Sequence, residues 1–489
     1  MMKIGFDNDK YLSIQSEHIK ERIAKFKGKL YLELGGKLFD DHHASRVLPG
    51  FQPDSKLRMF SKISDQIEIV IVISAEDIER NKVRADLGIT YDEDVLRLRD
   101  EFIGRGFMVG SVVITHYNGQ HTADDFRKRL GRMGIKSYVH YLIDGYPHNV
   151  QLIASDDGFG KNDYVVTERP LVIVTAPGPG SGKMAVCLSQ LYNEHKRGIE
   201  AGYAKFETFP VWSLPLKHPV NIAYEAATAD LNDVNMIDPF HLEAYGKTAI
   251  NYNRDIEIFP VLNALFEGIY GYNPYKSPTD MGVNMVGFCI SNDEVCCEAS
   301  KNEIVRRYYD ATNKFANGAS NEAEVQKIQL LFNQAKINTD YRKVTVAARE
   351  RKAKNGGIPS AAIELEDGTI ITAEASDLLG SCAALLLNAM KHLAGIDHSV
   401  KLIPQNMIEP IQKTKVEYLQ GKNPRLHTDE VLVALSVLSQ VNDTCVKALE
   451  KLPLFKGCQA HATVMLSEVD RKILKKLGVG LTCDPIKKI

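Results

Sequence analysis

The residues best suited to chemistry lie in a glycine-rich turn, Ala-Pro-Gly-Pro-Gly-Ser-Gly-Lys, at residues 176–183. The β-branched run 171–175 precedes this turn, and an apolar helical pattern follows it. A strand, a turn with converging backbone N–H groups, a lysine and a helix N-terminus together make a phosphate-binding loop. We therefore predict that a nucleotide or another phosphorylated small molecule binds here, at Gly178, Gly180, Ser181, Gly182 and Lys183.

The turn resembles the phosphate loop of adenylate kinases but departs from the usual pattern at two positions. Pro177 stands where the pattern has its first glycine, and Met184 stands where it has the Ser or Thr that holds Mg²⁺. Loss of that hydroxyl removes one standard part of metal-assisted phosphoryl transfer. The sequence thus favours binding over transfer and leaves the use of Mg²⁺ open. The alternative is that the turn is only a tight connection between a strand and a helix.

A long polar segment, residues 206–243, follows this helix and offers acid and base groups. Its candidate catalytic residues are His218, Asp230, Asp233, Asp238 and His241. Asp230 and Asp233 lie three residues apart, as do Asp238 and His241, so each pair could share a helix face. The histidines titrate nearest neutral pH and could act in general acid–base catalysis. The alternative is that the acids cap helices and fill turns.

Metal-type side chains also occur near the N-terminus, at Asp40, Asp41 and His42. Consecutive residues rarely all point at one ion, so they are weak metal ligands, and a solvated loop or a contact to a phosphorylated substrate are the alternatives. The eight cysteines form no Cys-x-x-Cys pair, so we expect neither structural zinc nor a disulfide framework.

These groups must be positioned by an α/β multidomain fold. Strand-length apolar runs alternate with helical stretches in residues 1–250, which predicts a parallel α/β domain containing the phosphate-loop-like motif. Residues 251–340 have helical periodicity and are expected to form a mostly helical domain. Residues 341–489 predict a second α/β unit. A length of 489 residues allows about three domains.

The last of these domains resembles the cytidine-deaminase type of α/β/α sandwich. Two strands joined at Asp367-Gly368 predict a hairpin, and a buried helix is expected over 378–393. Further expected features are a strand over 400–403 and a helix capped by Thr428. The resemblance implies zinc ligands and a glutamate at the starts of two helices, but the chain has Gly380-Ser-Cys-Ala-Ala and Pro404-Gln-Asn-Met-Ile there. The fold is therefore expected without the deaminase chemistry.

Composition narrows the class of protein further. The chain has 60 basic and 62 acidic residues and a net charge of −2, which disfavours a nucleic-acid binder. No N-terminal signal segment and no apolar run of membrane-spanning length occur. We therefore expect a cytoplasmic protein that binds neither nucleic acid nor membrane.

Several segments together resemble one bacterial family. LELGGKLFDDHHASRVLPGF, TAPGPGSGKMA and SPTDMGVNM, spread over residues 32–285, are similar to the family catalogued as domain of unknown function 1846. The resemblance covers essentially the whole chain and implies a multidomain cytoplasmic protein. Some relatives are labelled as ATP-dependent peptidases, but the zinc-peptidase motif His-Glu-x-x-His is absent.

Three hypotheses of function follow from these observations. The first is a protein that binds a nucleotide or phosphorylated small molecule, with or without catalysis. The second is a non-catalytic scaffold that forms a homo-oligomer, in which the glycine-rich turn is structural. The third is a metal-dependent hydrolase that uses Asp40, His42 and the acids between residues 230 and 241. The sequence does not decide the reaction or the substrate.

Overall fold

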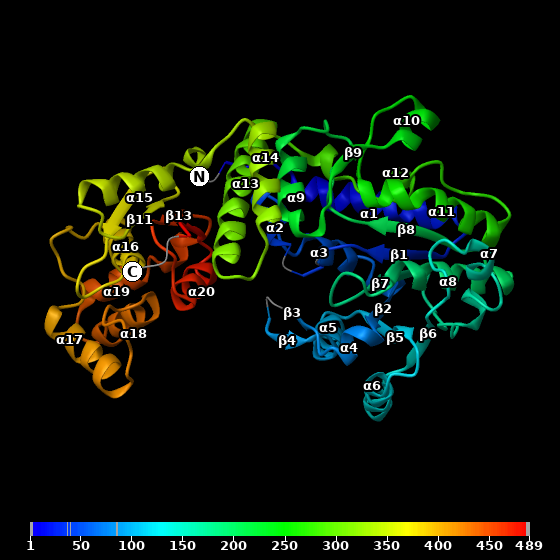
Figure 1. Ribbon diagram of the computed structural model, residues 1–489, viewed down its shortest axis with the longest axis horizontal. Helices are drawn as coiled ribbons and strands as arrows, with labels where there is room; N and C mark the ends of the chain where they lie inside the picture. Colours follow the sequence, from blue (N-terminus) through cyan, green and yellow to red (C-terminus); the bar gives the residue numbers. More distant parts are fainter. Residues whose placement is uncertain (1–2, 37, 40, 85–86, 486–489) are drawn as a thin grey trace. The chain divides into compact units, whose positions relative to one another are not determined.

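The computed structural model describes residues 3–36, 38–39, 41–84 and 87–485 (Figure 1). The chain divides into two compact units. The N-terminal unit comprises residues 4–225 and 231–297, and the C-terminal unit is built mainly from residue 298 onward together with 226–230. Both units combine a sheet with helices, so the protein is an α/β multidomain protein.

A parallel six-stranded sheet forms the centre of the N-terminal unit, in the order β6-β5-β2-β7-β1-β8. Its strands are β1 (Leu30–Leu34), β2 (Ile67–Ser74), β5 (Met108–Tyr117), β6 (Ser137–Tyr141), β7 (Leu171–Thr175) and β8 (Gly202–Phe206). Every residue of β1, β2 and β7 is buried. Strands covered on both faces have continuous apolar sequences, which is why these runs were recognisable as strands.

The helices and short strands of this unit connect and cover the sheet. The helices are α1 (Asn8–Lys25), α2 (His42–Val47), α3 (Ser55–Ser61), α4 (Ala75–Glu79), α5 (Tyr91–Gly104), α6 (His121–Arg132), α7 (Val150–Ile153), α8 (Lys183–Lys196), α9 (Pro219–Ala227), α10 (Pro239–Tyr245), α11 (Asn253–Tyr270) and α12 (Pro278–Met281). Two small antiparallel pairs are β3 (Val83–Arg84) with β4 (Ile89–Thr90) and β9 (Asn235–Ile237) with β10 (Ile250–Tyr252). Helix α8 packs against β1, β7 and β8, whereas α5 packs against β2 and β5.

The order of the strands creates a switch point between β2 and β7. These strands are neighbours, but the chain continues from β2 to β5 on one side and from β7 to β8 on the other. In open parallel sheets, ligands bind outside the carboxyl ends of the strands where the connections diverge in this way. The turn after β7 lies at this point.

The C-terminal unit contains a four-stranded sheet in the order β12-β11-β13-β14. Its elements are β11 (Ser360–Glu364), β12 (Ile370–Glu374), β13 (Gln459–Ala462), β14 (Gly480–Cys483) and the helices α13 (Asp293–Ala316, which begins in the N-terminal unit), α14 (Glu322–Ala335), α15 (Lys343–Lys354), α16 (Ser381–Leu393), α17 (Gln405–Lys413), α18 (Thr428–Leu438), α19 (Asp443–Leu449) and α20 (Glu468–Lys476). On β11, Ala361 and Ile363 face the core that contains α16, while Ala362 packs with Val344 and Ala348 of α15. Because successive strand residues face opposite sides, α15 and α16 cover opposite faces.

Three local expectations were wrong. Residues 400–403 form no strand, because the carbonyl of Val400 accepts a hydrogen bond from Lys391 and takes part in no ladder. Helix α18 begins at Thr428 with His427 as its cap, since Glu430 accepts from the His427 N–H at 2.8 Å. Asp230 lies in a 3-10 turn and Asp233 beyond it, so this pair shares no helix face.

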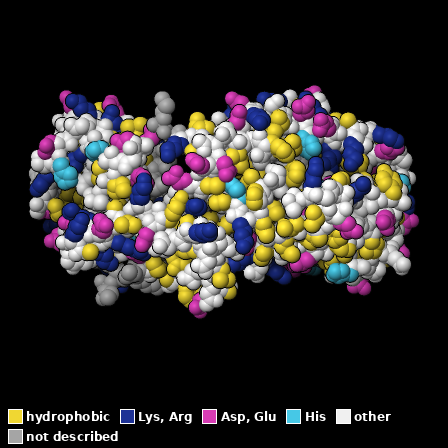
Figure 2. All heavy atoms as spheres, turned by 90° about the horizontal axis from the view of Figure 1, so that it is seen from above, with side chains coloured by type: hydrophobic (Ala, Val, Ile, Leu, Met, Phe, Trp, Pro, Cys, Tyr) yellow, Lys and Arg dark blue, Asp and Glu magenta, His cyan; other side chains and the backbone are white. Residues whose placement is uncertain are grey.

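On the face that Figure 2 shows, Lys and Arg side chains are mixed with Asp and Glu side chains. None of the helices in the described part of the chain is both long enough and apolar enough to cross a membrane.

Candidate functional site

The turn between β7 and α8 reverses the chain at the carboxyl end of the sheet. Gly182, the residue before α8, has φ +84°, and Gly180 has φ +76°. Both values lie in the left-handed region, which glycine adopts at no steric cost. The two glycines therefore direct the chain from the strand into the N-terminus of α8.

Backbone donors of this turn have no partner within the described chain. The N–H groups of Gly180, Ser181 and Gly182 make no hydrogen bond to the described residues, and no side chain caps α8. The Ser181 hydroxyl is also without a described partner, although the residue is only 2% exposed. Unpaired donors at the positive end of a 14-residue helix dipole favour an anion.

Neighbouring strands and helices hold the turn closely. A Cβ atom on Gly178 would lie 2.2 Å from Tyr91 Oη, and one on Gly182 would lie 3.2 Å from the Thr115 side chain. Thr115, on β5, also donates from Oγ1 to the Ser181 carbonyl at 2.6 Å. The turn is therefore fixed by contacts from two other elements.

Lys183 is the first residue of α8 and is partly exposed. None of the acidic residues in the described ranges forms an ion pair with it, so its ammonium is available to a ligand. Met184, in the place of a Mg²⁺-binding hydroxyl, packs against the core. The turn thus combines the Lys183 ammonium with backbone N–H donors, but it has no hydroxyl where phosphate loops hold Mg²⁺.

A serine and a histidine flank the turn at the ends of β2 and β5. Ser74 Oγ lies 3.1 Å from His116 Nδ1, and it also accepts a hydrogen bond from the Glu76 N–H at the start of α4. His116 has φ +50°, a conformation that non-glycine residues rarely adopt. Backbone strain of this kind is concentrated at functional sites.

A second polar cluster lies at the edge strand β8. Lys205 Nζ is 2.6 Å from Tyr252 Oη, 2.6 and 2.8 Å from the two oxygens of Asp255, and 3.4 Å from Glu207 Oε2. Lys205, Glu207 and Asp255 line a cavity of about 50 Å³ together with Trp212. The cavity is large enough for one or two water molecules.

Charge in this cluster is unbalanced, because one ammonium faces two carboxylates. Burial raises the pKa of Asp255 to about 6, and Glu207 adds to that rise against the opposing effect of Lys205. Burial opposes the charge of Lys205, but Asp255 and Glu207 outweigh it and raise the pKa of the ammonium. Asp255 is therefore a titratable acid near neutral pH.

Two of the three predicted acids of the 206–243 segment, Asp233 and Asp238, make structural contacts. Asp233 accepts two hydrogen bonds from Arg254, at 2.6 and 3.0 Å. Asp238 caps α10 through the His241 N–H and also accepts from Thr279 Oγ1 at 2.6 Å. Asp230 is exposed. The catalytic role of these carboxylates stays a prediction.

The two predicted histidines lie apart from the glycine-rich turn in sequence and have their own partners. His241 Nδ1 lies 3.1 Å from Ser277 Oγ, and the imidazole packs near Trp212. His218 Nε2 lies 3.0 Å from Asp293 Oδ1 and 3.5 Å from Cys297 Sγ. His218, Asp293 and Cys297 are the trio of metal-type side chains found among the described residues.

The tautomer of His218 argues against a metal at this trio. Its Nδ1 accepts a hydrogen bond from the Val220 N–H at 3.3 Å, so the proton of the neutral ring is on Nε2. A metal-bound Nε2 would have to be unprotonated, with Nδ1 donating instead. The contacts of His218 therefore fit a hydrogen-bonded residue just before α9 better than a metal ligand.

The N-terminal metal candidates do not converge in the described residues. Asp41 forms an ion pair with Lys56 at 3.0 Å and caps α2. Burial alone would raise the pKa of Asp41, but the ammonium of Lys56 holds it below its ordinary value. His42 begins α2 and is exposed, and Asp40 lies outside the described residues.

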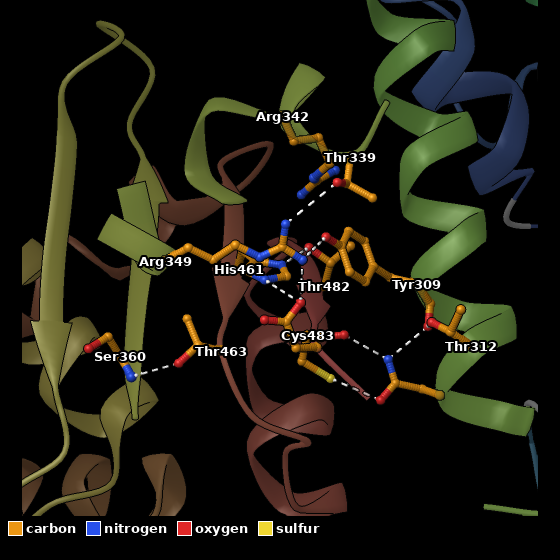
Figure 3. Close-up of polar contacts among 12 residues, drawn as sticks. Tyr309, Thr312, Thr339, Arg342, Arg349, Ser360, His461, Thr463, Thr482 and Cys483 are labelled. Atoms are coloured by element: carbon orange, nitrogen blue, oxygen red, sulfur yellow. Dashed lines mark hydrogen bonds and ion pairs between the residues drawn. The ribbon is translucent and has the colours of Figure 1, made fainter. Parts of the chain in front are cut away.

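Another polar network belongs to the C-terminal unit (Figure 3). Arg349, His461, Thr482 and Tyr309 come from α15, β13, β14 and α13 and point toward one another. His461 Nδ1 lies 2.9 Å from Thr482 Oγ1, and Arg349 donates to Asp484 at 2.8 Å and to Tyr309 Oη at 3.0 Å. Burial lowers the pKa of His461 although Asp484 opposes this. His461 Nε2 makes no hydrogen bond to the described residues but lies 3.4 Å from Asp484 Oδ1, and because most of the contacts are made within the network, we assign it to stability.

Sequence reasoning missed Ser74, Thr115, His116, Lys205 and Asp255. The first three are polar residues at the carboxyl ends of strands, and that position was a usable signal once a parallel sheet was expected. Lys205 on β8 and Asp255 on α11 are 50 residues apart in the chain but in contact in the fold. No local sequence pattern predicts such a contact.

Comparison with known families gives matches along the whole chain. The family model described as "Domain of unknown function DUF1846, N-terminal" matches residues 4–336, and the one described as "Domain of unknown function DUF1846, C-terminal" matches residues 340–488.

Curated relatives are similar over nearly their full length. A UPF0371 protein of Streptococcus uberis is 55% identical over 486 residues, which cover 99% of this chain and 98% of the relative. A UPF0371 protein of Corynebacterium urealyticum is 56% identical over 483 residues, covering 99% and 97%. One from Streptococcus pyogenes serotype M5 is 54% identical over 486 residues, covering 99% and 98%. These names state no activity.

Proposed function

This chain belongs to the DUF1846 family, and we propose that its turn between β7 and α8 binds the phosphate of a nucleotide or another phosphorylated small molecule. The observation that carries the proposal is the position of Lys183, which directly follows Gly180, Ser181 and Gly182 in the chain. The ammonium of Lys183 forms no ion pair with any described residue. The switch point between β2 and β7 supports the same location.

The proposed contacts follow from the geometry of the turn. Backbone N–H groups and the dipole of α8 attract an anion, and Lys183 supplies the full positive charge. Ser74 and His116, at the ends of the adjacent strands, would contact the part of the ligand beyond the phosphate. The residues point to binding rather than phosphoryl transfer, because Met184 offers no oxygen to Mg²⁺.

Equilibrium binding tests this proposal. Calorimetric titration with ATP, ADP, GTP and inorganic pyrophosphate is expected to give saturable binding of at least one of them by the wild-type chain. Lys183→Ala removes a charge-assisted contact worth about 1.5–3 kcal/mol, so affinity should fall roughly ten- to hundredfold.

A lysine on the same helix provides the matched control. Lys196 is in the last turn of α8, where its ammonium contacts Asp156 on the surface. Lys196→Ala is expected to bind the ligand as the wild type does. Equal binding by Lys183→Ala and the wild type, or no binding of any phosphorylated ligand by the wild type, would remove the proposal.

For the C-terminal unit we propose a cytidine-deaminase type of fold without the zinc chemistry. Support comes from the β11–β12 hairpin, from α15 and α16 on opposite faces, and from the parallel pair β13–β14. Cys382 is the second residue of α16 but is buried, with a pKa raised well above its ordinary value by that burial. Elemental analysis of purified protein should therefore find less than one zinc per chain, and stoichiometric zinc would contradict the assignment.

A further inference from the structure

A cavity of about 280 Å³ lies within the C-terminal unit. Its walls come from α16, from the segment 398–403 and from the beginning of α17. The deep part is apolar, with Leu387, Leu402 and Ile408 all buried. Ser399 and Lys401, at the same cavity, are exposed and place its opening along the 398–403 segment. Small-molecule sites are typically mostly apolar cavities of roughly 300–1,000 Å³ with a few polar groups, and this cavity is close to the lower end of that range.

The buried charged group that lines this cavity is Lys391, on the last turn of α16. It is 9% exposed, and its ammonium donates to the carbonyl oxygens of His398 at 2.8 Å and of Val400 at 3.4 Å. Among the described residues no carboxylate forms an ion pair with it. Burial lowers the pKa of Lys391, and Asp397 only partly opposes that effect. A buried ammonium without a counter-ion is costly, so an anion that entered the cavity would be attracted to it.

The residues that line the cavity indicate which kind of anion would bind there. Lys391, Lys401 and His398 line the cavity, and no Asp or Glu does. An ammonium has three N–H donors, and two of those on Lys391 are directed at carbonyl groups. The remaining donor suits a monoanion better than a phosphate dianion, and the apolar walls suit a hydrocarbon body.

The volume limits the size of the ligand. An engineered apolar cavity of about 150 Å³ holds benzene, so roughly twice that volume accommodates about ten non-hydrogen atoms. We propose that the C-terminal unit binds a small monocarboxylic acid with an apolar body, whose carboxylate contacts Lys391 and whose hydrocarbon part lies against Leu387, Leu402 and Ile408.

The test compares octanoate with octanol, which has the same chain without the charge. Binding to the full chain is measured by calorimetry and by saturation-transfer NMR. The wild type is expected to bind octanoate at least about tenfold more tightly than octanol, the effect of one charge-assisted hydrogen bond. Equal affinities for the two compounds, or no binding of octanoate at millimolar concentration, would overturn the proposal.

Variants locate the site. Lys391→Met keeps the length of the side chain and removes its charge, so it should abolish the preference for octanoate while octanol binding stays within about twofold. Lys401→Met, at the exposed opening, is the matched control and should keep the preference. An unchanged preference in Lys391→Met contradicts the proposed contact.

A third variant covers the case in which Lys391→Met does not fold. Ala384 lines the cavity from α16, and Ala384→Leu fills part of the space without touching the lysine charge. This variant should weaken octanoate and octanol together by at least about tenfold, with thermal unfolding monitored by circular dichroism as the check on folding. Undiminished binding of both compounds by folded Ala384→Leu would place them elsewhere and overturn the proposal.

Discussion

Thr115 Oγ1 donates a hydrogen bond of 2.6 Å to the carbonyl oxygen of Ser181. The two residues are 66 positions apart, and the bond connects the end of β5 to the turn after β7. Since the donors of that turn are backbone groups, their direction depends on how the turn is held. The proposed phosphate site is thus held by β5, whereas the strand that leads into it is β7.

Replacing Thr115 tests this connection. Thr115→Val keeps the shape of the side chain but leaves the buried Ser181 carbonyl without its donor, which costs about 1–3 kcal/mol. We expect lower stability in urea unfolding and at least about fivefold weaker binding of the phosphorylated ligand. Thr115→Ser retains the hydroxyl and should behave nearly as the wild type, and a Thr115→Val protein of wild-type stability and affinity would show that the bond is unimportant.

Met184 allows a test of the missing metal contact. Met184→Thr places a hydroxyl directly after Lys183, where phosphate loops have their Mg²⁺ ligand. The wild type should bind the ligand equally with Mg²⁺ and with a chelator, whereas the variant should gain affinity from Mg²⁺. Met184→Val, of similar shape to threonine, controls for the lost packing. Strong Mg²⁺ dependence in the wild type would count against this role of Met184.

The Lys205 cluster predicts a large and pH-dependent loss of stability. Lys205→Met leaves the buried Asp255 and the partly exposed Glu207 without their cation, which should lower the free energy of unfolding by about 3–5 kcal/mol. The pKa of Asp255 is already raised to about 6 in the folded protein, above its ordinary value, so the stability due to its protonation is present at low pH and lost as pH rises through 6. The loss in Lys205→Met should accordingly be smaller at pH 5 than at pH 8.

A double variant separates charge from packing in this cluster. Lys205→Met with Asp255→Asn removes the ammonium together with one of its two carboxylate partners. Urea unfolding is expected to show recovery of at least about half of the stability lost in the single variant. If the double variant is as unstable as the single one, the loss comes from packing and not from unpaired charge.

We expect His140 to make the stability of the fold depend on pH in a second way, with lower stability at lower pH. The residue is buried on β6, and Nε2 lies 3.1 Å from the Asp163 carbonyl while Nδ1 has no described partner. Burial lowers the pKa of His140 from 6.5 to about 4, against the effect of Asp163. Because the unfolded chain takes up the proton first, stability is lost as pH falls from about 6.5 to 4.

The expected size of this effect is about 3 kcal/mol, from roughly 1.4 kcal/mol for each pKa unit. His140→Gln lacks the titrating group and should lose correspondingly less stability between pH 7 and pH 4 in guanidinium unfolding. His148→Gln changes an exposed histidine and should follow the wild type. Parallel stability curves for His140→Gln and the wild type would contradict this role.

Local patterns in the sequence were sufficient for most elements of the fold. The apolar runs at 67–73 and 171–175 became β2 and β7, because strands buried on both faces need continuous apolar residues. The Asp367-Gly368 hairpin also formed, with Gly368 at φ +84°. The expected strand at 400–403 did not form, and the carbonyls of Val400 and of the preceding His398 accept hydrogen bonds from Lys391 instead. Sequence periodicity gives no sign of such a contact between distant side-chain and backbone groups.

The sequence by itself determined the family, the α/β class and the glycine-rich turn, since these depend on residues that are adjacent or regularly spaced. Only the tertiary structure decided that this turn lies at the switch point between β2 and β7, that Thr115 and Tyr91 hold it, and that Lys391 faces an apolar cavity. The physical reason is that strand order and side-chain burial are set by packing over the whole chain, whereas a sequence pattern reports only which faces of each element are apolar.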